Sequence, residues 1–143
     1  MKKQFQVLTF VLISGLAITF TSCNKEDEME PPTISFKTGA GYTSANANVT
    51  AGNSILIGIE AAKADSEEES EDVLTHFNIT KSVNGGTGTS VYDIDVPAAN
   101  EDDYDYDFNT TAGATVGDTE KYTFTITNRD GLTGQISLTI TVQ

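Results

Sequence analysis

Residues 121–143 decide the fold class; they read KYTFTITNRDGLTGQISLTITVQ. Two runs in this stretch alternate large apolar residues with Thr or Ser, and a segment that contains Asp130 and Gly131 joins them. Alternation with a period of two is typical of strands that bury one face and expose the other. The stretch therefore predicts a β-hairpin. Its buried stripe is expected to consist of Tyr122, Phe124, Ile126, Ile136, Leu138, Ile140 and Val142.

Five segments upstream alternate in the same way, and turn signals separate them. They are 33–37, 54–61, 73–81, 90–96 and 104–108. Asn84, Gly85 and Gly86 lie between the third and the fourth and predict a tight hairpin, because the central positions of such a turn need positive φ. The remaining segments, including the polar run 43–48, are expected to form loops. Seven short strands and almost no helical pattern predict an all-β, antiparallel β-sandwich.

The segment 117–142 also resembles the end of immunoglobulin-like domains of the PKD and related bacterial types. In those domains a Tyr opens a Thr-rich strand, an Asp or Asn and a Gly form the turn, and a final Thr/Val strand follows. Tyr122, Asn128 and Gly131 match this pattern, although the chain lacks the Trp that PKD domains usually carry. The resemblance implies a seven-stranded immunoglobulin-like sandwich over residues 33–143. It also implies that Tyr122 could tie its strand to the preceding loop.

The first 22 residues predict an export signal that is not part of the fold. Lys2 and Lys3 precede an apolar run, 7–20, and small residues follow it immediately before Cys23. The run is shorter than the roughly 20 residues that a membrane-spanning helix needs, so it predicts a cleaved secretory signal. The stretch resembles a bacterial lipoprotein signal. That resemblance implies that Cys23 becomes a lipid-bearing N-terminus in the outer membrane; an ordinary signal peptide is the alternative.

Residues 23–32 are expected to form a lipid-anchored acidic linker between this signal and the domain. The run NKEDE at 24–28 resembles the surface-export signal of Bacteroidetes-type lipoproteins, which implies exposure at the cell surface. Pro31 and Pro32 then stiffen the start of the domain.

The charge of the chain excludes one class of partner. The net charge is −13, and removal of the signal changes it to −15 because two lysines and no acidic residues leave. Nucleic-acid binding needs a basic surface, so we expect no nucleic-acid partner.

The sequence contains no catalytic signature. His76 is the single histidine and lies in a predicted strand, without a nucleophile or an orienting group at motif spacing. A pair of carboxylates could hydrolyse glycosides, but in so acidic a chain such a pair identifies nothing. We therefore expect a structural histidine and a protein that is not an enzyme.

Three acidic segments, 65–72, 98–103 and 128–130, would meet at one end of an immunoglobulin-like sandwich. Carboxylate oxygens at this density suit Ca²⁺, which takes six to eight oxygen ligands. The candidate ligands are Asp72, Asp102, Asp103 and Asp130. No spaced signature such as an EF-hand supports the site, and the alternative is that the carboxylates keep the domain soluble. Because the first strand begins at this end, the tether favours the opposite end or a sheet face for a large partner.

Tyr42, in a Gly-rich loop, is the aromatic residue that we expect to be most exposed. An exposed Tyr can stack on a sugar ring or anchor a protein partner, and packing within its own loop is the alternative. The sequence thus predicts a surface lipoprotein with a non-catalytic binding or scaffolding domain. Its partner would be an unknown surface protein or glycan, by analogy with similar lipoproteins. A calcium-dependent adhesion or recognition module is the alternative function.

Overall fold

The structure is a computed structural model that describes residues 30–64 and 72–143. The predicted signal, Cys23, the acidic run 24–28 and most of the acidic segment 65–72 lie outside the described residues. Within the described ranges, no helix has both the length and the apolar character that a membrane crossing requires.

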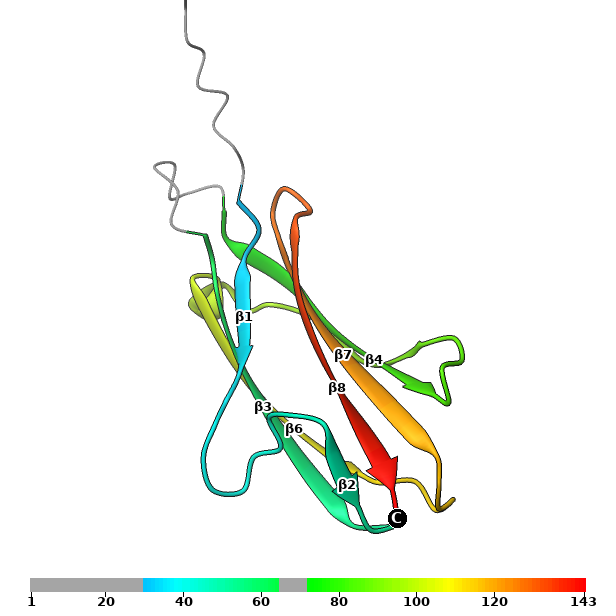
Figure 1. Ribbon diagram of the computed structural model, residues 1–143. Coiled ribbons are helices and arrows are strands. Elements are labelled where there is room, and N and C mark those ends of the chain that lie inside the picture. The colour runs from blue at the N-terminus through cyan, green and yellow to red at the C-terminus, as the bar shows by residue number, and fades with distance from the viewer. Residues whose placement is uncertain (1–29, 65–71) are drawn as a thin grey trace, which may run out of the picture.

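The described chain forms eight strands and one short 3₁₀ turn. They are β1 (Thr33–Phe36), β2 (Ala47–Val49), β3 (Ser54–Ala62), β4 (Leu74–Val83), β5 (Thr89–Asp95), η1 (Ala98–Asn100), β6 (Asp103–Thr111), β7 (Thr119–Asn128) and β8 (Thr133–Val142). The strands form two facing layers, a smaller sheet with the order β1-β3-β6 and a larger sheet with the order β2-β8-β7-β4-β5 (Figure 1). All neighbours are antiparallel except β2 and β8.

This strand order confirms the predicted β-sandwich. β1, β3 and β6 take the positions of strands A, B and E of an immunoglobulin-like domain, and β4, β5, β7 and β8 take those of C, C′, F and G. The seven strands that the sequence predicts are all present. The turn between β4 and β5 is also as predicted, since Asn84 has φ 52° and Gly85 has φ 72°.

The short strand β2 corrects the prediction of a loop across 43–48. β2 pairs in parallel with β8 from Ala47 opposite Ile140 to Val49 opposite Val142. Three residues are too few to show a period of two, and the partner strand is at the far end of the chain. No local pattern could therefore have indicated this pairing.

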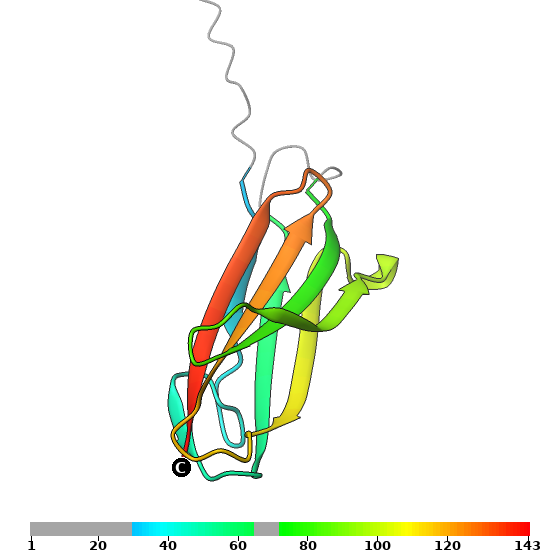
Figure 2. The same cartoon turned by 90° about the vertical axis from the view of Figure 1, so that its right-hand side faces the viewer.

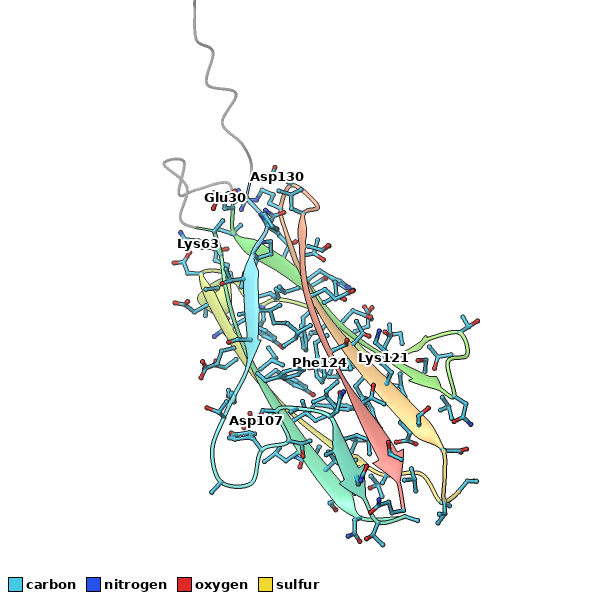
Figure 3. The ribbon with its side chains drawn as sticks, in the orientation of Figure 1. Glu30, Lys63, Asp107, Lys121, Phe124 and Asp130 are labelled. Carbon is cyan, nitrogen blue, oxygen red and sulfur yellow. The ribbon has the colours of Figure 1, made fainter. Side chains whose placement is uncertain are left out.

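The core lies where the closing hairpin faces the smaller sheet. Tyr122, Phe124 and Ile126 are fully buried, and the β8 stripe is buried as well except for the half-buried Ile136. The Phe124 ring meets the Phe36 ring edge-on, with 5.7 Å between the centroids. Figure 3 shows Phe124 between the two sheets. The predicted stripe of the hairpin is thus the larger sheet's contribution to the core.

The ends of the described chain lie at opposite ends of the sandwich. Glu30 lies beside the β7–β8 turn, near Asp130 (Figure 3). Gln143 lies at the other end, next to β2 (Figure 1). The start of the described chain and the β7–β8 turn with Asp130 therefore occupy one end, as the sequence predicts.

Candidate functional site

The described parts of the connections that carry the acidic segments meet at one end of the sandwich, which we call the acidic end. Backbone hydrogen bonds join them in pairs: Lys63 N to Asp102 O at 2.9 Å, Leu74 N to Glu101 O at 2.7 Å, and Arg129 N to Val73 O at 3.0 Å. Figure 3 shows Glu30, Lys63 and Asp130 at this end. The convergence follows from the strand order, because the end of β3, the start of β4 and the β5–β6 and β7–β8 connections all lie on the same side.

The four predicted calcium ligands lie at the acidic end without forming a common site. Asp102 Oδ1 pairs with Lys63 Nζ at 2.9 Å, so a cation already sits beside this carboxylate. Asp72 is buried, Asp103 is the first residue of β6, and Asp130 is exposed in the β7–β8 turn. Across residues 30–64 and 72–143, no three His, Cys, Asp or Glu side chains are placed to share a metal ion. Calcium binding stays a prediction.

Tyr42 packs against the smaller sheet and is half-buried; the sequence predicts either an exposed ring or a packed one. A Cβ atom placed on Gly58 would lie 2.6 Å from Tyr42 Cε1, so the missing side chain of Gly58 makes room for the ring. The Tyr42 hydroxyl donates to Asp107 Oδ2 at 3.1 Å, and this bond raises the pKa of Tyr42. Lys37 Nζ holds the other oxygen of Asp107 at 3.0 Å. This geometry favours the packing alternative for Tyr42.

His76 lies on the outer face of the larger sheet and links β4 to β5. Its Nδ1 is 3.2 Å from Asp95 Oδ1, and its Nε2 is 3.4 Å from Asp93 Oδ2. The two carboxylates come from β5 positions that pair with β4. The contacts of His76 are thus those of a cross-strand link, as we expect of a structural histidine.

Glu120 forms a buried polar cluster that the sequence analysis missed. Its side chain is 3% exposed; Oε1 accepts from Lys81 Nζ at 2.7 Å and from Gly113 N at 3.2 Å, and Oε2 accepts from Tyr122 OH at 3.0 Å. Tyr122 is therefore tied to the preceding loop through this carboxylate. A signal was present, because the period of two places Glu120 on the same face as Tyr122 and Phe124.

The outward residues of β7 and β8 form a surface of hydroxyl and amide groups, which we call the hydroxyl face. Its members are Thr119, Lys121, Thr123, Thr125, Thr127, Thr133, Gln135, Ser137, Thr139 and Thr141. All of them are described, and Lys121 is the single charged residue among them. The residues lie opposite one another in cross-strand rows, such as Thr123 with Ser137 and Thr125 with Gln135. Figure 2 looks onto this side of the molecule, with β8, β7 and β4 side by side.

A recess of about 230 Å³ lies where the hydroxyl face meets β2. It is lined by Asn46, Ala47, Asn48, Thr139 and Thr141. Asn46 Oδ1 accepts a hydrogen bond from Thr139 N at 2.8 Å, which fixes this amide against β8. Sequence reasoning did not find the recess, because it depends on the pairing of β2 with β8.

Comparison with known proteins supports the fold and goes no further. No family model matches the chain, and no curated protein does. Two structures of superoxide reductase (neelaredoxin) from Ignicoccus hospitalis are similar to this chain, with TM-scores of 0.53 and 0.52 and 10% sequence identity. The similarity covers 78% and 80% of this chain and 80% and 81% of theirs. The sporulation control protein Spo0M from Bacillus subtilis has a TM-score of 0.49 at 9% identity, over 80% of this chain and 50% of Spo0M. At such identities the likeness is one of β-sandwich architecture.

Proposed function

We propose that this protein is a lipid-anchored binding or scaffolding module of the bacterial cell surface. In this proposal the protein performs no chemistry itself and contacts its partner through the hydroxyl face. The observation that carries the proposal is that the hydroxyl face has no outward carboxylate. The chain has a net charge of −13, yet no carboxylate points outward from β7 or β8. Charged side chains are depleted from the centres of protein interfaces because burying them requires desolvation. A polar face with no outward carboxylate and with Lys121 as its single charged residue is therefore the surface that a partner can cover at least cost.

The position of the hydroxyl face relative to the chain's start supports this choice. The described chain begins at the acidic end, so a tether on Cys23 would approach the sandwich there. β7 and β8 extend from the acidic end to the end that carries Gln143 (Figure 1). Much of the hydroxyl face is thus distant from the proposed tether and open to a surface protein or glycan. The PKD-like pattern of 117–142 and the lipoprotein-like pattern of 1–28 agree with such a module.

Site-specific photo-cross-linking on intact cells tests the contact surface. A photo-reactive residue would replace the exposed Ser137 on β8 and, as a matched control, the exposed Asn109 on the outer side of β6. We expect adducts with a surface protein or glycan from position 137 and none from 109. Ser137→Glu should weaken the interaction, whereas Asn109→Glu should not. Adducts confined to position 109, or equal losses in both Glu variants, would contradict the proposal.

The anchor is tested separately. Cys23→Ala should release the protein from the membrane fraction, because the thioether-linked lipid can no longer form. Protein that stays in the membrane after this change would show the anchor assignment to be wrong. Protease treatment of intact cells then distinguishes outward from periplasmic orientation, since only an outward-facing domain is cleaved.

A further inference from the structure

We infer that the recess between β2 and β8 binds a neutral polyhydroxy ligand, such as one or two sugar residues of a surface glycan. The inference rests on the proposed function and deepens it, because the recess lies at the β2 edge of the hydroxyl face. Two observations carry it: the hydrogen-bonding chemistry of the lining residues and the lack of charge among them.

The recess offers uncharged donors and acceptors at close spacing. Asn46 and Asn48 provide primary amides, and Thr139 and Thr141 provide hydroxyls that both donate and accept. Since Asn46 Oδ1 is engaged by Thr139 N, the Nδ2 group of this amide is left as a donor. A complementary ligand must present donors and acceptors alternately and without charge, as the adjacent hydroxyl groups of a sugar do.

Charge argues against ionic ligands at this position. An anion would have to approach a protein whose net charge is −13. A cation would find no carboxylate among the lining residues. A neutral ligand avoids both penalties.

An extended peptide is the competing ligand at this position. A peptide that adds to a sheet uses the free backbone groups of an edge strand. Here β2 already pairs with β8 from Ile140 to Val142, and Asn46 Oδ1 caps the amide of Thr139 just before that pairing. This pairing occupies β8 from Ile140 to Val142, but β2 is the terminal strand of the larger sheet, so a peptide could still pair along its outer edge. A saturable response to a neutral disaccharide is what distinguishes a sugar ligand from such a peptide.

The lining also suggests the strength of binding. Two paired strands hold the polar groups, so their positions are defined before the ligand arrives. The lining contains no aromatic ring on which a sugar could stack. We expect a dissociation constant on the order of 1 mM for one site. Several copies of the protein on a cell surface would bind a glycan together more tightly than one site does.

A backbone-amide NMR titration of the full chain, in a detergent without a sugar headgroup, tests the inference. The probes are cellobiose, maltose, mannobiose and chitobiose, with glucuronic acid and spermidine as charged comparators. We expect at least one neutral disaccharide to shift the amides of 46–48 and 139–141 in a saturable manner. Asn48→Ala combined with Thr141→Val should lower its affinity at least about tenfold. Asn109→Ala, on the outer side of β6 and away from the hydroxyl face, should leave it unchanged.

The outcomes separate this inference from the function on which it rests. The inference is overturned if no neutral sugar shifts the recess amides, if the double variant keeps its affinity, or if a charged comparator binds there more tightly. If the amide chemical shifts outside the recess are the same in the double variant as in the unmodified protein, the variant is folded. Cross-links from position 137 that persist without sugar binding would retain the proposed face and remove only the recess. Sugar binding in the recess without such cross-links would retain the recess as a sugar site and remove the proposed partner face.

Discussion

Glu120 carries a charge inside the sandwich, and its partners explain why the strand accommodates it. Partial burial lowers the pKa of Lys81, but the hydrogen bonds to Glu120 and Tyr122 outweigh this effect, so the pKa is raised above its usual value. A charge that is buried with its partner is tolerated, whereas a charge left alone is costly. The Lys81–Glu120 pair is therefore a unit, and it also holds Gly113 and Tyr122 in place.

Removing the charge of Glu120 should destabilise the fold. Glu120→Gln keeps the shape of the side chain but leaves the partly buried Lys81 ammonium without its counter-charge. We expect the free energy of unfolding to fall by about 2 kcal/mol, measured by urea denaturation. The matched control is Asp102→Asn, which breaks the more exposed pair with Lys63 and should cost less than about 0.5 kcal/mol. Equal losses in the two variants would contradict this account.

Tyrosine ionisation should destabilise the protein in strongly alkaline solution. Burial, followed by a hydrogen bond with Tyr92, raises the pKa of Tyr106 to about 12, and burial also raises the pKa of Tyr104. Above pH 10 the unfolded chain loses these protons while the folded chain keeps them, so the unfolded state binds fewer protons. The free energy of unfolding should therefore fall as the pH rises from about 10 to about 12.

Two measurements check this pH dependence. Tyrosinate absorbance should rise in separate steps, and Tyr106→Phe should remove the step near pH 12. Urea denaturation at several pH values should show the loss of stability over the same interval. A single step, with every tyrosine titrating near its ordinary pKa, would show that burial does not raise the pKa of Tyr104 and Tyr106.

Among the structural elements, a turn can be predicted from local residues, whereas the packing of a strand depends on residues far away in the chain. The Asn84-Gly85 turn was predicted from its own residues, and in the structure Asn84 also bonds to Asp118 and Thr119. The contact of β8 with the start of the domain depends on residues far apart in the chain. A Cβ atom on Gly134 would collide with the carbonyl oxygen of Pro32, so the chain passes directly over this glycine. A glycine within a strand, here the second residue of β8, can thus mark a backbone crossing.

Gly134→Ala should push the Pro32 backbone away from β8. Because a backbone atom cannot rotate aside as a side chain can, we expect a loss of about 1–3 kcal/mol in the free energy of unfolding. Gly88→Ala is the matched control, since the added atom would meet Thr80 at an ordinary contact distance of 3.6 Å. The change in stability of each variant is measured from the midpoint of its urea denaturation curve. A neutral Gly134→Ala would mean that the start of the domain is not fixed at this point.

For the molecule as a whole, sequence reasoning was reliable where the controlling interaction was local. The period of two located seven strands, and the strand order that they implied brought the acidic loops together. The sequence left exposure and packing of Tyr42 as alternatives, because its packing depends on Gly58 and Asp107, which lie on β3 and β6. The recess depends on Asn46 and Thr139, 93 residues apart. A sequence pattern that spans only a few residues could not have indicated that Tyr42 contacts Gly58 and Asp107, or that Asn46 contacts Thr139.

The distribution of charge leads to a last prediction, on the response of the whole molecule to cations. A net charge of −13 destabilises the compact state by self-repulsion, which salt screens. In the described part of the chain no three carboxylates converge, and Asp102 already has Lys63 as its counter-charge. We therefore expect sodium chloride to raise the melting temperature, and millimolar Ca²⁺ and Mg²⁺ to raise it equally. A rise of several degrees with Ca²⁺ that Mg²⁺ does not reproduce would contradict this expectation and support the calcium-dependent alternative. If Asp130→Asn then abolished that rise, the ion would be located at the acidic end, where the β7–β8 turn would supply one of its ligands.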